Sequence, residues 1–146
     1  MHSDRLGTQT ARSSSRPRTT ARAILAVAAG YVVIALLSTL VQEIWLGGVS
    51  YQHSSQRVLV LAGIFTPLTA VAGGLASAWL SPRAPLRSCL ALCGLIVAET
   101  TYLYATGRVD GPLWFEAGAA SSLVVAVLLG CALVLRRARA LRGQRL

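Results

Sequence analysis

Four long apolar runs fill most of this 146-residue chain. They cover residues 23–46, 58–80, 86–106 and 113–135. Each run is long enough to cross a bilayer, because a hydrocarbon core of about 30 Å takes about 20 helical residues. Short connections force neighbouring helices to run antiparallel. The predicted fold class is therefore all-α: a polytopic membrane protein built as an antiparallel four-transmembrane-helix bundle.

The composition leaves no room for a separate soluble domain. Hydrophobic residues make up 54 % of the chain and the mean hydropathy is +0.59, which is too apolar for an ordinary soluble protein. We expect one transmembrane domain over residues 22–136. The Arg-, Ser- and Thr-rich segment 1–21 lacks apolar periodicity and is predicted to be disordered. The basic tail 137–146 is expected to continue the fourth helix into the headgroup region.

The basic residues are all arginine, and they are distributed unevenly between the two sides of a four-span topology. Only Arg57 and Arg108 fall on one side. The other side receives Arg5, Arg12, Arg16, Arg18, Arg22, Arg83, Arg87, Arg136, Arg137, Arg139, Arg142 and Arg145. The positive-inside rule then predicts a multi-pass membrane protein with both termini in the cytoplasm.

The net charge of +9 is expected to interact with the membrane surface. Arginines in the two tails are expected to attract anionic lipid headgroups. Nucleic-acid binding is not expected, because no reading motif accompanies the charge. The first apolar run is interpreted as a retained span rather than a cleaved signal, since it is longer than a signal core and no A-x-A-like site ends it.

Glu99 is the one carboxylate deep inside an apolar run, where an ionisable residue is costly. Counting about 1.5 Å per helical residue, hydroxyl side chains of all four runs reach a similar depth. The candidate proton, cation or ligand site comprises Glu99, Thr100, Thr66, Thr69, Ser38, Thr39 and Ser122. We hypothesise a polar pocket open to the outer side, floored by Glu99 and rimmed by Gln42, Glu43 and Glu116. Two interpretations of Glu99 stay open: an interhelical hydrogen-bonding residue, or a functional proton or cation site.

Small residues recur every fourth position on two of the runs. One stripe is Gly118, Ser122, Ala126 and Gly130, and the other is Ala70, Gly74 and Ala78. Such faces allow helix backbones to approach closely in lipid. The spacing does not distinguish packing within one bundle from packing between chains.

No catalytic or cofactor motif is present. The sequence contains no G-x-x-x-x-G-K-[ST], G-x-S-x-G or H-E-x-x-H pattern, so the chain is not expected to be an enzyme or to bind a cofactor. Cys89, Cys93 and Cys131 have no His or fourth Cys beside them, which argues against a zinc site. We interpret them as small buried thiols, and no metal is expected.

The segments TPLTAVAGG at 66–74 and SPRAPLR at 81–87 resemble the second span and inner turn of small uncharacterised four-span bacterial membrane proteins. This resemblance implies a bacterial inner membrane and four crossings, and it implies no function. Small multidrug resistance transporters also have four spans and one membrane carboxylate. Their carboxylate lies in the first span, whereas Glu99 lies in the third.

Two functions are therefore expected. The first is a non-enzymatic accessory or assembly partner that packs through its small-residue faces, either with a second copy of itself or with another membrane subunit. The alternative is a small proton- or cation-coupled transporter that uses Glu99.

Overall fold

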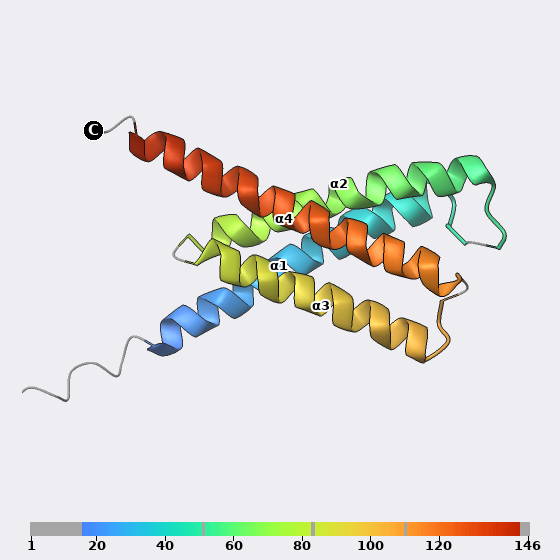
Figure 1. Ribbon diagram of the computed structural model, residues 1–146, viewed down its shortest axis with the longest axis horizontal. Coiled ribbons are helices and arrows are strands. Elements are labelled where there is room, and N and C mark those ends of the chain that lie inside the picture. Colours follow the sequence, from blue (N-terminus) through green and yellow to red (C-terminus); the bar gives the residue numbers. More distant parts are fainter. Residues whose placement is uncertain (1–15, 51, 83, 110, 144–146) are drawn as a thin grey trace, which may run out of the picture.

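A computed structural model describes residues 16–50, 52–82, 84–109 and 111–143. Its elements are α1 (Arg16–Thr39), the π-helix η1 (Leu40–Trp45), α2 (Gln56–Leu80), α3 (Pro85–Ala105) and α4 (Leu113–Gly143). Consecutive helices run antiparallel (Figure 1). Within the described residues, four helices are long and apolar enough to cross a membrane. The predicted all-α, four-span bundle is confirmed.

The two ends of the bundle differ in charge. The start of α1, the α2–α3 turn and the end of α4 lie together (Figure 1), and we call this the arginine-rich end. The arginines at this end include Arg22, Arg87, Arg136, Arg137 and Arg139. The opposite end carries the connections before α2 and before α4, with Arg57 and Arg108.

Two boundaries differ from the sequence prediction. α1 begins at Arg16, so the helix extends from the apolar run into residues 16–21 of the polar segment before it. Residues 1–15 of that tail lie outside the described residues. α4 continues to Gly143, so the predicted helical continuation of the basic tail is confirmed. Residue 136 is a change of composition and not an end of the helix.

The first span does not remain α-helical to its end. Leu40–Trp45 form a π-helix, with the N–H of Leu46 bonded to the carbonyl of Val41 at 3.0 Å. Gly47 and Gly48 follow with φ of 73° and 88°, a left-handed conformation that favours glycine. The first span therefore ends at these glycines. The π-helix was not predicted.

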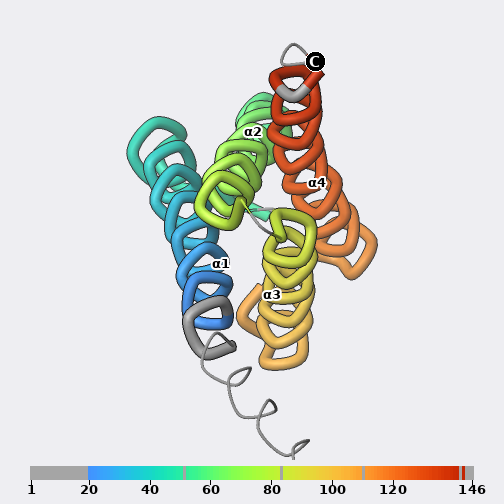
Figure 2. Tube along the Cα trace, turned by 90° about the vertical axis from the view of Figure 1, so that its left-hand side faces the viewer, coloured from blue at the N-terminus to red at the C-terminus, as the bar shows by residue number. Residues whose placement is uncertain are grey.

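The four helices pack around a common core, and α2 lies between α1 and α4 (Figure 2). α2 packs most extensively against α4 and α1, α3 packs mainly on α4, and α1 contacts α3 on the remaining side. Helices α1 and α4 stand apart, as Figure 2 shows.

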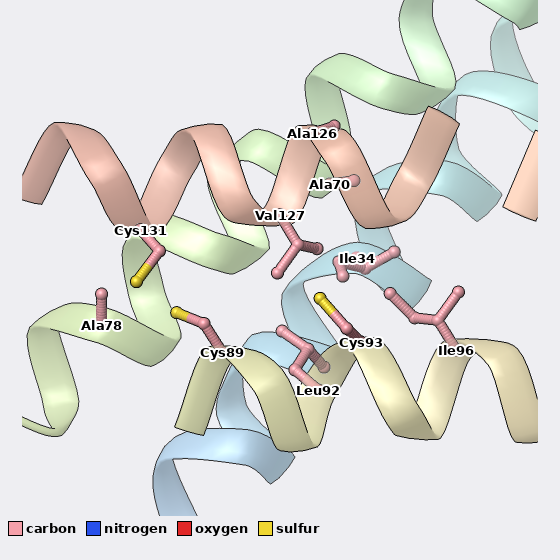
Figure 3. Close-up of a cluster of buried hydrophobic side chains, with 10 residues drawn as sticks. All are labelled: Ile34, Ala70, Ala78, Cys89, Leu92, Cys93, Ile96, Ala126, Val127 and Cys131. Atoms are coloured by element: carbon pink, nitrogen blue, oxygen red, sulfur yellow. The ribbon is translucent and has the colours of Figure 1, made fainter. Parts of the chain in front are cut away.

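The core contains small side chains and the periphery contains large ones. Ala70, Ala78, Ala126, Cys89 and Cys131 are buried around Leu92 and Val127 (Figure 3). Large apolar side chains point outward instead, such as Leu36 at 66 % and Val60 at 55 % exposure. This pattern suits a lipid environment, where bulky apolar side chains gain nothing from hiding and small ones allow close backbone contact.

Two adjacent glycines of α2 make the closest helix contacts. A Cβ at Gly74 would collide with the backbone carbonyl of Val127, and one at Gly130 with that of Val71, so these positions bring α2 and α4 together. A Cβ at Gly73 would collide with the Ile34 side chain and lie 2.8 Å from the Gly30 carbonyl of α1. Within the second predicted stripe, Ala70, Gly74 and Ala78 are all buried.

Candidate functional site

Polar side chains join α1 and its π-helix to α2. The Thr69 hydroxyl donates to the Thr66 carbonyl at 2.7 Å, which commits its single hydrogen. Ser38 must therefore donate to Thr69 Oγ1, at 2.8 Å. One turn further along, Gln42 Nε2 donates to Thr66 Oγ1 at 3.0 Å. The structure thus brings together four of the predicted polar residues, and all four lie at one helix pair.

Ser38→Ala removes one interhelical bond of this network. We expect a loss of about 0.6 kcal/mol in the free energy of unfolding, the average for hydrogen bonds between membrane helices. The effect is small because Thr69 keeps its bond to Thr66. Detergent-induced unfolding followed by circular dichroism measures it. Thr101→Val is the control, since the Thr101 hydroxyl bonds only within α3, to Val97 at 2.7 Å; a larger loss in the control than in Ser38→Ala would contradict the assignment.

Glu99 belongs to a different helix pair. Its Oε1 accepts a 2.7 Å hydrogen bond from the Tyr31 hydroxyl of α1, and its side chain is exposed on the bundle surface. Sequence reasoning missed Tyr31. The available signal was a tyrosine 11 residues into the Thr20–Trp45 span, about 17 Å from its start, where an interfacial role does not explain the hydroxyl.

The remaining hydroxyls of the predicted polar layer turn back onto their own helices. Thr100 donates to the Ile96 carbonyl at 2.9 Å and Ser122 to the Ala119 carbonyl at 2.7 Å. Thr39 is exposed. Similar depth therefore does not assemble a layer shared by four helices, because serine and threonine can satisfy themselves locally.

A cavity of about 600 Å³ lies at the end of the bundle opposite the arginine-rich end. It is enclosed by η1, α2, α4 and the connections that precede α2 and α4. Gln42, Thr66, Glu116 and Ser122 are among its lining residues, but Glu99 and Glu43 are not. The expectation that Glu99 floors a pocket rimmed by Glu43 does not match this arrangement. Glu43 is exposed on the π-helix, and Glu99 is held by Tyr31.

Two backbone features add polarity to this cavity. Pro67 cannot supply the helical donor for the Gly63 carbonyl, and both residues line the cavity. Glu116 lies in the first turn of α4, where the helix dipole favours a carboxylate. Its side chain folds towards Gly111, since a Cβ there would lie 2.5 Å from Glu116 Oε1. The cavity therefore offers the Glu116 carboxylate, the Arg108 guanidinium, an amide and hydroxyl groups to a small polar solute.

The small-residue stripe of α4 is divided in two. Ala126 and Gly130 are buried against α2. Gly118 and Ser122 are exposed, and a Cβ at Gly118 would meet nothing within 4 Å. One half of the stripe therefore packs within the bundle, and the other half is open.

The three cysteines are buried and free. Cys89 and Cys131 point towards one another from α3 and α4 beside Ala78 (Figure 3), and the Cys89 thiol lies 3.8 Å from the Gly74 carbonyl. Among the described residues, no group of three His, Cys, Asp or Glu side chains is arranged to hold a metal ion. Cys89, Cys93 and Cys131 belong to the buried core, and Cys89 lies next to the α2–α4 contact.

Comparison with protein-family models, with curated proteins and with solved structures finds no match for this chain.

Proposed function

We propose that this protein is a non-enzymatic subunit of a bacterial inner membrane, with both termini in the cytoplasm, that assembles with another membrane protein. The orientation is supported by the concentration of arginine at one end of the bundle. Assembly is supported by a carboxylate that the bundle itself leaves exposed.

Glu99 carries this proposal. It lies six residues before Ala105, the last residue of α3, or about 9 Å inside the helix end. Its side chain is exposed there, between the exposed Leu95 one turn before it and the exposed Tyr102 one turn after it. A carboxylate facing hydrocarbon is costly, and membrane carboxylates almost always face protein or water. A partner helix over this face of α3 removes Glu99 from lipid.

The experiment compares two leucines of α3 as cross-linking positions. A photoreactive phenylalanine analogue at position 95 lies on the same face of α3 as Glu99. The same analogue at position 90 lies on the opposite face of α3. Both leucines are exposed, at 41 % and 54 %. We expect illumination of intact membranes to give a discrete protein adduct from position 95 only. Glu99→Leu is expected to abolish that adduct while the bundle still folds.

The outcomes are decisive. Lipid adducts alone at both positions would overturn the proposal, and so would an adduct from position 95 that survives Glu99→Leu. An adduct of twice the 15.4 kDa chain mass would show that the chain assembles with itself, against the proposed second subunit.

The cavity at the opposite end favours a second candidate function, proton- or cation-coupled transport. Its carboxylate is Glu116, while Glu99 lies outside its lining. Proteoliposomes containing a trapped pH-sensitive dye test this function. A proton flux that Glu116→Gln abolishes would support transport through the cavity, and a flux that only Glu99→Gln abolishes would support the role predicted from the sequence.

A further inference from the structure

A second and larger hollow lies at the arginine-rich end. It is a groove of about 1140 Å³ between the last turns of α2, the α2–α3 turn and the final part of α4. α4 extends past the end of α2 here (Figure 1), so that one wall of the groove continues beyond the other. Its lining includes Leu75, Trp79, Leu133, Leu135, Arg137 and Arg139.

The groove is lined mostly by apolar side chains, including Leu141 near its far end, and by two arginines in the last part of α4. Leu75, Trp79 and Leu133 belong to the apolar runs of α2 and α4, whereas Arg137 and Arg139 follow after the α4 run ends. From Leu133 to Arg139 the helix rises about 9 Å. The lining contains two guanidinium groups and no acidic residue. Its occupant must therefore be amphipathic and negatively charged.

We propose that this groove binds one acidic phospholipid. The acyl chain lies along Leu75, Trp79 and Leu133, and the headgroup phosphate is held by Arg137 and Arg139. Guanidinium suits this role because its planar donors match the oxygens of a phosphate. A partner helix would leave these two arginines without a counter-charge. The proposal does not rest on the proposed assembly function, which concerns the face of α3.

The three tryptophans allow a direct test, because Trp79 lines the groove at 82 % exposure and the others, Trp45 and Trp114, lie at the opposite end. Trp45→Phe/Trp114→Phe leaves Trp79 as the only tryptophan emitter. This protein is reconstituted in mixtures of phosphatidylglycerol and phosphatidylcholine, one of which has brominated acyl chains that quench tryptophan on contact. We expect phosphatidylglycerol to be preferred at Trp79 by at least about five-fold, since one arginine near an acidic lipid contributes about 1 kcal/mol.

Charge-matched variants separate a built site from general surface attraction. Arg137→Gln/Arg139→Gln is expected to reduce the preference to within two-fold of unity. Arg87→Gln/Arg136→Gln removes the same charge from two arginines at the same end that are equally exposed but lie outside the groove lining, and this variant is expected to keep most of the preference.

Three results would overturn the proposal. The first is equal quenching by the two brominated lipids in the parent. The second is an equal loss of preference in both double variants, which would indicate attraction to the basic surface as a whole. The third is no quenching by either lipid, which would mean that protein covers Trp79.

Discussion

Gly74→Ala is expected to push α4 away from α2 and expose the buried thiols. The new methyl group would collide with the backbone carbonyl of Val127, and no side-chain rotation can relieve a backbone collision. We expect the free energy of unfolding to fall by about 1–3 kcal/mol, the usual range for overpacking. Gly130→Ala meets the Val71 carbonyl across the same contact and should act similarly.

The native cysteines report this separation, so no cysteine has to be introduced. Cys89 and Cys131 are 0 % and 1 % exposed and lie beside the α2–α4 contact. Their alkylation by a membrane-permeant maleimide requires opening of the bundle. A loss of 1.4 kcal/mol in the opening free energy corresponds to about a ten-fold faster reaction, so the expected loss in Gly74→Ala corresponds to an increase of about five-fold or more.

Gly63→Ala is the matched control on the same helix. A Cβ at Gly63 meets nothing within 4 Å, and alanine favours the helix by up to about 1 kcal/mol over glycine. Thiol reactivity should therefore stay at the wild-type rate. If Gly63→Ala and Gly74→Ala react equally fast, the close α2–α4 contact is not what buries the thiols.

The fold was predictable because a lipid bilayer allows few arrangements for a chain with four long apolar runs. Run length sets the spans, short connections set the antiparallel order, and Gly47 with Gly48 marks a helix end. The stripe of α2 also predicted where backbones meet, since Gly74 lies at the α4 contact. The π-helix Leu40–Trp45 was not predictable from hydropathy. An α-helix and a π-helix of the same residues have the same hydropathy and differ only in which carbonyl accepts each N–H hydrogen bond.

The polar site was predictable in its residues but only partly in its pairs. Depth along each helix follows from counting residues, whereas pairing depends on how each helix is rotated about its axis. Ser38 and Thr69 lie at the same depth and on facing sides of their helices, so they form a hydrogen bond. Thr100 instead bonds to a carbonyl of its own helix. Glu99 pairs with Tyr31, a residue that no motif singled out. Rotation is set by close glycine contacts, and these involve both partners at once.

Gly73→Ala is expected to separate α1 from α2. A second substitution, Ile34→Ala, should restore part of the lost stability. The methyl group of Gly73→Ala would collide mainly with the Ile34 side chain and also approach the Gly30 carbonyl to 2.8 Å. The free energy of unfolding should fall by about 1–3 kcal/mol. The Ser38–Thr69 bond lies further along the same helix pair, so Ser38→Ala should cost less in the Gly73→Ala background than in the wild type.

Ile34→Ala supplies the second half of this test. It removes the atoms that the Gly73→Ala methyl group meets first, so the double variant should be more stable than the sum of the two single losses predicts. A coupling energy of about 0.5–3 kcal/mol is typical of residues in contact. Recovery is incomplete, because the Gly30 carbonyl stays in place. No equivalent rescue exists for Gly74→Ala, whose obstacle is backbone, and detergent unfolding of both sets compares them. Strict additivity at Gly73 and Ile34 would show that α1 does not approach α2 in the geometry described.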